Sequence, residues 1–589
     1  MEASSRPKLV DTARKRSGSD HIAPDCRGLN FYSIDESFCD LVGLYMEPAL
    51  RSHLEPRLVR LGELAGGRLD ELAATADRNP PVLHSRDRFG RDEDWIEYHP
   101  AYREMEQIAF GELGMHAMSH RAGVLGWSEP LPPIAKYAFQ YLFVQAEFGL
   151  MCPVSVSDTT NFVILKYGAE DLKRRLTPRL LSQDLGQLWK GTQFMTEKSG
   201  GSDVGALETV ARREQGEWRL YGDKWFCSHT DADLALLLAR PEGAPAGTRG
   251  LGLFAMPRRL DDGSRNRYRI ARLKDKFGTR SMASGEIMLE GAFAWPVGEL
   301  RNGFKQMMDQ VNLSRLSHGV RAAAMMRRCL NESLTVARNR IAFGRALIEM
   351  PLVRRQLMKI MLPAEQALSM YAYTAHVMGA ANRGGEGAAQ LLRILTPLYK
   401  FRACRDNVRV ATAAMEMRGG NGYVEDWVNA RLVRDAHVGV LWEGTSNIVA
   451  LDVVARAVAK SHAHQALGEA LREKLAEATE IPAQFRDPLG ALIARVVAFA
   501  AEVASGSANH ARLAATALYN LTSAVLMTWE AAKTGNGKRL LLARMVIDHR
   551  LRPHDPLAPD DGPHADAAIE MLLDEKPLAL ASAARVACG

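Results

Sequence analysis

The sequence of 589 residues contains few cysteines and no long uncharged apolar run. Its seven cysteines are scattered, odd in number and without a C-x-x-C pair, which argues against a zinc site and against a disulfide framework. No uncharged apolar run reaches the ~18 residues that a membrane span needs. The basic side chains near the start are followed by no apolar stretch, so they do not form a secretory signal. We therefore expect a soluble, cytoplasmic protein without membrane contact, and a mobile tail over residues 1–25.

An excess of one charge is also missing, as are the common nucleotide motifs. Lys plus Arg number 75 against 69 Asp plus Glu, and this net charge of +6 does not predict a nucleic-acid binder. The sequence has no strand-linked G-x-G-x-x-G and no Walker A motif, which argues against the Rossmann and P-loop folds. His462 and His464 alone do not make a metal site, so we predict none.

What the sequence does contain is a change of hydrophobic period along the chain. Apolar residues recur at three- and four-residue spacing over residues 29–141, which predicts amphipathic helices, whereas residues 76–95, rich in Asp, Arg and Pro, predict an exposed loop. Between residues 209 and 297, short β-prone runs separated by turn residues predict a compact β domain. These runs are residues 218–221, 234–238, 252–256 and 287–289.

The helical period returns in the second half of the chain. Residues 303–459 predict a bundle of long helices, because prolines are few there and the glycines cluster mainly at residues 384–387 and 419–422. A further helical block over residues 461–573, with turns at residues 481–482 and 535–537 and a loop rich in Pro, Asp and His at residues 553–563, is typical of an added domain.

Two short motifs border or lie within the predicted β domain. Residues 193–204 read Gln-Phe-Met-Thr-Glu-Lys-Ser-Gly-Gly-Ser-Asp-Val, and such small and hydroxyl residues let the backbone approach a flat heteroaromatic ring. Residues 224–228, Lys-Trp-Phe-Cys-Ser, are expected on a strand. Taken alone, the first motif is more typical of a Gly/Ser turn, and the second of a strand that faces the core.

Three more motifs lie in the predicted helical bundle. Residues 340–344 read Arg-Ile-Ala-Phe-Gly, and residues 416–423 read Glu-Met-Arg-Gly-Gly-Asn-Gly-Tyr. An ordinary cationic helix end and a glycine C-cap would explain these two by themselves. Residues 431–435, Arg-Leu-Val-Arg-Asp, precede residues 441–448, Leu-Trp-Glu-Gly-Thr-Ser-Asn-Ile.

With these motifs in this order, the sequence resembles the acyl-CoA dehydrogenases over about residues 30–460. Its length, its Thr-Glu-Lys run at residues 196–198 and its added block most resemble the AidB-like subfamily. The resemblance implies an α+β, mainly α, acyl-CoA dehydrogenase-like fold. This fold has an N-terminal helical domain (26–190), a middle β-barrel or sandwich domain (191–300) and a C-terminal four-helix bundle (301–460), to which an additional helical domain (461–589) is added here.

The resemblance also implies non-covalently bound FAD and an acyl-CoA substrate. Glu443 would be the base that removes the α-proton, with its own backbone N–H as oxyanion donor, and burial beside Trp442 and the flavin should raise its pKa toward neutrality. The residues expected to bind FAD are Met195, Thr196, Gly201, Ser202, Phe226, Ser228, Arg340, Phe343, Gly419, Gly420, Thr445 and Asn447. Those expected to bind the substrate are Ser202, Asn312, Arg315, Trp442 and Gly444.

Two departures from the family pattern affect these assignments. Asn312 stands where many relatives have an acidic residue three positions before the arginine, here Arg315, so the grip on CoA is expected to differ. Lys198 replaces a proline in the flavin-side loop. The family further implies an electron-transfer flavoprotein as partner and a homo-oligomer, a tetramer built as a dimer of dimers. In relatives, the residues equivalent to Arg340, Phe343 and the double glycine at 419–420 contact the FAD of the neighbouring subunit.

Two other functions stay open, an AidB-like DNA-associated flavoprotein that protects against alkylation and a protein that sequesters acyl-CoA. DNA is not favoured, because residues 451–589 contain 15 Lys plus Arg against 16 Asp plus Glu. The same block has a local basic cluster, which we interpret as a solvated face rather than a binding patch. Its members are Lys533, Lys538, Arg539, Arg544, Arg550 and Arg552.

Overall fold

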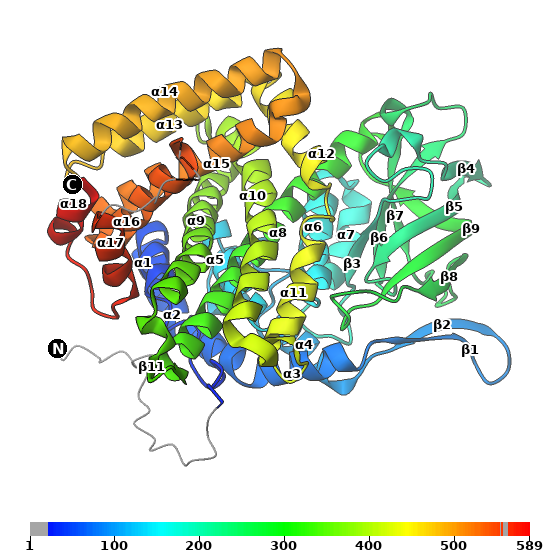
Figure 1. Cartoon of the computed structure of the whole chain (residues 1–589). Helices are drawn as coiled ribbons and strands as arrows, with labels where there is room; N and C mark the ends of the chain where they lie inside the picture. Colours follow the sequence, from blue (N-terminus) through cyan, green and yellow to red (C-terminus); the bar gives the residue numbers. More distant parts are fainter. Residues whose placement is uncertain (1–21, 554, 556, 558–562, 589) are drawn as a thin grey trace. The chain divides into compact units, whose positions relative to one another are not determined.

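The strands of the middle segment close into a small barrel (Figure 1). The structure, a computed structural model, describes residues 22–553, 555, 557 and 563–588. The strands are β3 (Gly191–Phe194), β4 (Val210–Glu214), β5 (Glu217–Ser228), β6 (Leu234–Pro241), β7 (Gly252–Pro257), β8 (Tyr268–Leu273) and β9 (Ser284–Pro296). Their order is β3-β6-β4-β5-β9-β7; β7 also pairs with β6, so the path closes, and β8 pairs with β9. The predicted strand runs are confirmed, and β3, β4 and β8 lie outside them.

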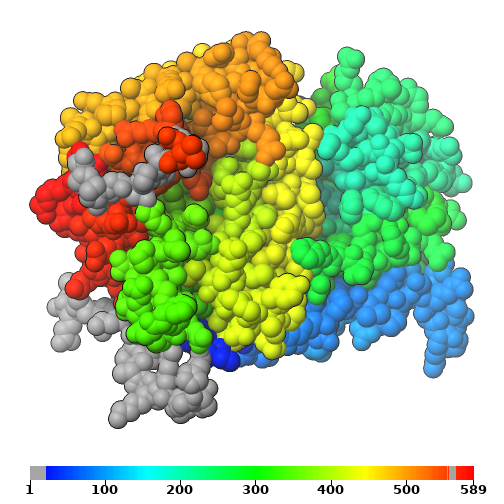
Figure 2. Space-filling view, viewed as in Figure 1, coloured from blue at the N-terminus to red at the C-terminus, as the bar shows by residue number. Residues whose placement is uncertain are grey.

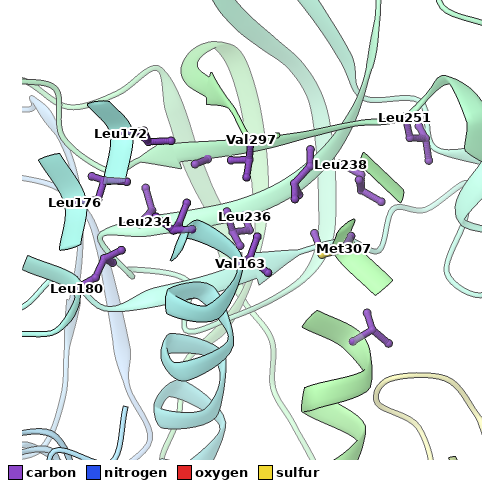
Figure 3. Close-up of a cluster of buried hydrophobic side chains, with 14 of the residues drawn as sticks. Val163, Leu172, Leu176, Leu180, Leu234, Leu236, Leu238, Leu251, Val297 and Met307 are labelled. Atoms are coloured by element: carbon purple, nitrogen blue, oxygen red, sulfur yellow. The ribbon is translucent and has the colours of Figure 1, made fainter. Parts of the chain in front are cut away.

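Strand β6 shows why one of these runs is continuously apolar. Leu234, Leu236 and Leu238 face a cluster that also contains residues of α6 (Met151–Tyr167), α7 (Glu170–Leu180) and α8 (Gly303–Asn339) (Figure 3). The alternate residues Ala235 and Leu237 face the interior of the barrel. Because side chains of a strand alternate between its faces, a strand that is buried on both sides needs apolar residues at every position.

The chain divides into two units. The barrel unit comprises Arg68–Pro132 and Ala146–Ser317. The helical unit comprises the chain up to Gly67, Pro133–Gln145 and the chain from His318 onward. Helix α8 contributes residues to both units, since the boundary falls within it.

The prediction of an exposed loop at residues 76–95 is wrong in part. Helix α3 (Arg68–Arg78) extends into this segment, and β1 (Val82–Arg86) pairs antiparallel with β2 (Asp92–Glu97) as a hairpin that projects in Figure 1. The Asp87 carboxylate closes the turn by accepting from Phe89 N at 2.8 Å and Arg91 N at 2.9 Å. Most side chains of both strands are exposed or half-buried, so polar residues are tolerated and the composition imitates that of a loop.

The helical unit contains the long helices α9 (Pro351–Asn382) and α10 (Ala388–Arg418) and the second half of α8, which confirms the predicted long helices. Its other α-helices are α1 (Glu36–Tyr45), α2 (Pro48–Gly66), α5 (Pro133–Val144), α11 (Val428–Val438), α12 (Ser446–Leu451), α13 (Ala463–Ala476), α14 (Ala483–Ser505), α15 (Ala511–Thr534), α16 (Gly537–Val546), α17 (Pro563–Leu573) and α18 (Leu580–Cys588). The fold class is therefore α+β and mainly α, as predicted. The predicted tail over residues 1–21, and most of the loop at residues 553–563, lie outside the described residues.

A buried ionic network joins the start of the chain to the last helices. Asp35 caps α1 by accepting from Phe38 N at 3.0 Å, and it also lies 3.0 Å from Nε of Arg327. Glu365 on α9 pairs with Arg327 at 2.5 Å and with Arg539 at 2.6 Å. Arg539, on α16, continues the network to Glu530 on α15. Since a buried charge is tolerated only when it is paired, these helices depend on one another.

Helix α14 is the single described helix that is long and apolar enough to cross a bilayer by length and composition. Core helices of soluble proteins pass the same test, which makes it weak as an indicator of a membrane span. Only 28% of its most apolar window is buried, and the helix lies at the surface of the view in Figure 2.

Candidate functional site

In the barrel unit, one group of predicted site residues lies in the segment between β3 and β4. Thr196 follows β3, and its carbonyl accepts from Trp225 N of β5 at 2.8 Å, which brings the two predicted flavin motifs together. Glu197 and Gly200 exchange backbone hydrogen bonds of 3.0 and 3.3 Å, so the chain turns back there. Gly201 and Ser202 are exposed beyond this turn, while Met195 packs against the apolar cluster of Figure 3.

A buried ion pair between Lys224 and Glu197 fixes the turn at residues 197–200. Lys224 Nζ lies 2.6 Å from Glu197 Oε1 and also donates to the Leu238 carbonyl at 2.9 Å. The carboxylate additionally accepts from Glu208 N at 2.6 Å and from the Thr209 hydroxyl. Burial alone raises the pKa of Glu197, but the Lys224 ammonium and these hydrogen bonds lower it below its ordinary value. Sequence reasoning did not assign this pair.

Strand β5 presents an aromatic ring and a hydroxyl next to this turn. The register of β5 against β9 shifts between Lys224 and Cys227, and the intervening Phe226 is 55% exposed. The Ser228 carbonyl accepts from Thr192 Oγ1 at 2.6 Å, and its hydroxyl lies 3.5 Å from that of Ser284. A large exposed aromatic ring beside hydroxyl groups is typical of a ligand surface. It fits FAD, whose flat ring needs an apolar face and a polar edge.

Two of the residues that the sequence assigns to the substrate, Asn312 and Arg315, lie on α8. Arg315 is buried, and its guanidinium donates to Asn312 Oδ1 at 3.3 Å. The amide oxygen of Asn312 therefore serves as an acceptor at the position where many relatives are acidic, but without a negative charge.

In the helical unit, a second group of predicted site residues lies in the loop between α11 and α12. This loop carries Trp442, Glu443 and Gly444, and Glu443 is half-buried. The Trp442 ring packs edge-on against His318, with ring centroids 5.6 Å apart, and Lys400 Nζ donates to the Gly444 carbonyl at 2.5 Å. Sequence reasoning did not identify Lys400 or His318. A lone lysine in the apolar middle of α10 was the one available signal.

Thr445 and Asn447 are exposed at the start of α12. Thr445 is the N-cap residue of this helix, yet its side chain makes no capping hydrogen bond. Both side chains are therefore accessible to a ligand.

The Arg-x-x-Arg-Asp motif that precedes this loop is structural. Arg431, Arg434 and Asp435 are buried in α11, and Arg434 pairs with Glu425. This motif therefore anchors the helix that leads to Glu443 rather than supplying a reactive group.

The remaining predicted residues lie on exposed turns of the helical unit. Arg340 precedes the short hairpin β10 (Ile341–Ala342) and β11 (Arg345–Ala346), and Phe343 at its tip is 96% exposed. Gly419 and Gly420 follow α10 and are also exposed. Below them, Arg418 pairs with the buried Glu332 at 2.7 Å, and Glu332 also accepts from Cys26 Sγ at 2.9 Å. This packing fixes the glycine turn.

The basic cluster near the C-terminus is not the solvated face that the sequence indicated. Arg539 is buried between two carboxylates, and Lys538 donates to the Asp574 carbonyl at 2.5 Å. Arg544 and Arg552 both pair with Asp548, at 2.6 and 3.0 Å. Arg550 pairs with Asp406 at 3.3 Å. Because most of these cations have partners, the cluster does not form a free basic face.

No group of three or more His, Cys, Asp or Glu side chains able to hold a metal ion occurs among the described residues.

Comparison with protein families gives a match along most of the chain. Residues 22–186 match the model of the adaptive response protein AidB N-terminal domain, residues 192–292 that of the acyl-CoA dehydrogenase middle domain, and residues 301–459 that of the acyl-CoA dehydrogenase C-terminal domain.

Individual relatives agree with these matches. The chain is 33% identical to AidB of Escherichia coli (strain K12), over 68% of this chain and 74% of that protein. It is 30% identical to acyl-CoA dehydrogenase family member 11 of Caenorhabditis elegans, over 71% of this chain and 69% of that protein. The crystal structure of C. elegans ACDH-11 in complex with C11-CoA has the same fold, with a TM-score of 0.84 at 24% identity, and covers 97% of this chain and 99% of that one.

Proposed function

The chain belongs to the acyl-CoA dehydrogenase family, in its AidB-like branch, and we propose that it oxidises an acyl-CoA thioester to the trans-2-enoyl-CoA. It is an oxidoreductase of this family and a flavoprotein whose cofactor is FAD. The observation that supports the reaction best is the placement of Glu443, half-buried in a loop that is anchored on both sides. A base must be reachable by substrate and yet held in one position.

Glu443 has two roles in the proposed reaction. The α-hydrogen of a thioester is a weak acid, so a carboxylate removes it only if the developing enolate oxygen is stabilised at the same time. The Glu443 carboxylate takes this proton, and the Glu443 backbone N–H donates to the thioester oxygen. Bound FAD supplies the acceptor for the hydride that leaves the β-carbon.

In each unit, a separate group of residues is proposed to contact FAD. In the barrel unit, the ring would rest on Phe226 and Met195, and the hydroxyls of Thr196, Ser202 and Ser228 would bond its polar edge, with Gly201 leaving room for the backbone to approach. In the helical unit, Thr445 and Asn447 would supply further hydrogen bonds. Their exposure without capping roles supports this assignment.

Residues of each unit are likewise proposed to contact the acyl-CoA. Asn312, Arg315 and Ser202 would hold the CoA part, and Trp442 and Gly444 would border the reacting carbons. The C. elegans relative was crystallised with C11-CoA, which supports an acyl-CoA as the ligand class.

We infer a homo-oligomer, a tetramer built as a dimer of dimers, in which Arg340, Phe343, Gly419 and Gly420 contact the FAD of a second subunit. The nearly complete exposure of Phe343 supports this, because its ring is accessible to a second subunit. An electron-transfer flavoprotein is the proposed electron acceptor, and the cytoplasm the proposed location.

The proposal is tested by anaerobic titration of the FAD-loaded protein with short, branched, medium and long acyl-CoAs. One class is expected to bleach the flavin absorbance. Glu443→Gln should keep FAD but bleach about 10³-fold more slowly, since removal of a general base typically costs 10²–10⁴-fold. Glu502→Gln, which changes an exposed glutamate on α14, is the matched control and should behave as wild type. Tight acyl-CoA binding without any bleaching would instead identify a sequestering protein.

A DNA-associated role is the second candidate, favoured by the match of residues 22–186 to the AidB N-terminal domain. The pairing of the C-terminal basic cluster argues against that cluster as a DNA surface. Binding of duplex DNA with a steep salt dependence, in a protein that no acyl-CoA bleaches, would establish this second function.

A further inference from the structure

The loop that carries Glu443 adopts a backbone conformation that side-chain-bearing residues rarely accept. Glu443 has a φ of 55° and Gly444 a φ of 96°, so both lie in the left-handed region. For a residue with a Cβ this conformation costs roughly 1–2 kcal/mol. It persists only when the surroundings hold it, and such strain is concentrated at functional sites.

One anchor lies before Glu443. The amides of Leu441 and Trp442 both donate to the Val438 carbonyl at the end of α11, at 3.0 and 3.1 Å. The Trp442 ring packs against His318 with an interplanar angle of 75°. These contacts fix the chain up to the residue preceding the base.

The second anchor lies after Glu443 and comes from Lys400. The Lys400 side chain reaches from the middle of α10 to the Gly444 carbonyl at 2.5 Å, and Lys400 is only 1% exposed. A charged donor makes a hydrogen bond roughly twice as strong as a neutral one. Directly afterwards, Val449 N donates to the Thr445 carbonyl at 3.0 Å and α12 begins. Glu443 therefore lies between two fixed points.

We propose that Lys400 is a positioning residue that holds Glu443 in its left-handed conformation through the Gly444 carbonyl. This inference rests on the proposed function, because it assigns to Lys400 the task of aiming the base and its backbone N–H. In this proposal the lysine acts through the Gly444 carbonyl. It fixes the rotation of the Gly444 peptide, and without it the loop can relax toward conformations that cost less for a glutamate.

The environment of the loop favours Glu443 over its neighbour His318 as the base. Burial lowers the pKa of His318 well below its ordinary value, and the charges of Arg321 and Lys400 lower it further. His318 faces the Trp442 ring and is neutral at physiological pH, so it supports the loop by packing.

Two substitutions and a matched control test the proposal. Lys400→Met keeps the length of the side chain and removes the donor, whereas Lys400→Gln retains a neutral donor. Thr396→Val changes a buried residue one turn earlier on α10, from which no hydrogen bond to the loop is found among the described residues. All variants are prepared as the FAD-loaded full chain. FAD content, acyl-CoA dissociation constant, single-turnover bleaching rate and amide hydrogen exchange over residues 439–445 are then measured.

Lys400→Met should bleach about 100-fold more slowly with a dissociation constant within about threefold of wild type, because small misplacement of a catalytic group costs that much. Its loop amides should exchange faster. Lys400→Gln should recover about tenfold of the lost rate, and Thr396→Val should match wild type in every measurement. Wild-type exchange and bleaching in Lys400→Met, or in Lys400→Gln if the first variant fails to fold, would overturn the proposal. If none of the acyl-CoAs bleaches the flavin of the wild type, the proposed reaction fails. The exchange data still decide whether Lys400 anchors the loop.

Discussion

At the scale of single residues, two adjacent glycines differ in whether the backbone angle requires a glycine, although both have space for a side chain. Gly419 has a φ of 69°, whereas Gly420 has an ordinary φ, and a Cβ built on either would meet no atom within 4 Å. Glycine is therefore required at 419 by its backbone angle. At 420 the fold accepts a side chain, so a functional reason is needed to explain a glycine there.

We expect Gly419→Ala to lower the free energy of unfolding by about 1–2 kcal/mol, because alanine in the left-handed region is strained. Gly420→Ala should change it by less than about 0.5 kcal/mol. If the double glycine lies against the FAD of a second subunit, Gly420→Ala should nevertheless weaken FAD binding. Urea unfolding and FAD titration of both variants measure this. Normal FAD affinity in Gly420→Ala would remove the functional reason for that glycine.

A buried histidine gives the barrel unit a predictable pH dependence. His116 is fully buried with Nε2 2.9 Å from the Ser182 carbonyl, and burial, outweighing the favourable effect of that carbonyl, lowers its pKa to about 4. Between this value and the ordinary 6.5, the unfolded chain binds a proton that the folded chain does not.

The free energy of unfolding should therefore fall as pH is lowered from about 6.5 to about 4, by up to roughly 3 kcal/mol from this residue. His116→Gln, which retains a donor toward Ser182, should flatten the slope in urea unfolding measured across this range. Part of the slope should remain, since burial also lowers the pKa of His229 to about 4. An unchanged slope in the variant would show that His116 is not neutral in the fold.

At the scale of elements, the sequence pattern predicted the buried strands, whose residues are continuously apolar, and missed the exposed strands. The run at residues 234–238 was recognisable because β6 is buried on both faces. The β1–β2 hairpin was not, because its exposed strands carry loop-like residues. For the site, the motifs gave the residues that the family shares, such as Glu443. They did not give Lys400, since helical spacing shows which side of α10 is buried but not which distant loop it contacts.

The burial of Lys224 was predictable in principle from the alternation of side chains along β5. Leu220 faces the barrel interior, and counting by twos from it places Lys224 on the same side, where a charge requires a partner. The partner itself lies in the turn after β3, and local pattern does not identify it.

Glu197→Gln should destabilise the protein by about 3 kcal/mol, because Lys224 would keep a buried charge without its carboxylate. The turn that carries Thr196 and Ser202 should loosen, and FAD binding should weaken with it. In the double variant Glu197→Gln/Lys224→Met, most of the stability should return, since no charge is then buried. Urea unfolding of the single and double variants tests this. Equal losses in both would mean that the turn depends on the Glu197 hydrogen bonds rather than on the charge.

At the scale of the whole molecule, the C-terminal helices are part of the main helical core. Helix α9 is buried along one continuous stretch on all its sides, and its polar residues face the last helices: Gln366 donates to the Ser523 hydroxyl at 2.7 Å and Ser369 to Glu530 at 2.8 Å. The same unit contains both the bundle and these helices. Sequence pattern indicated an added block because the turn residues that separate helices look alike within a domain and between domains.

A chain truncated after Lys460 should consequently fail to form a native core, although it retains every predicted catalytic and cofactor residue. Truncation removes Arg539 and Glu530 and exposes the polar face of α9 together with the apolar surface around it.

In the full chain, Arg539→Met alone should lower the free energy of unfolding by about 3–5 kcal/mol, since it leaves Glu530 buried without its cation. The control is Arg585→Met on the last helix, where the guanidinium donates to the Ser582 hydroxyl at 3.2 Å; it should lower the free energy of unfolding by less than about 0.5 kcal/mol. Near-UV circular dichroism and urea unfolding distinguish the outcomes. A truncated chain that unfolds cooperatively would establish that the last helices are an independent domain, whereas loss of fixed tertiary structure in it would establish them as one wall of the helical core.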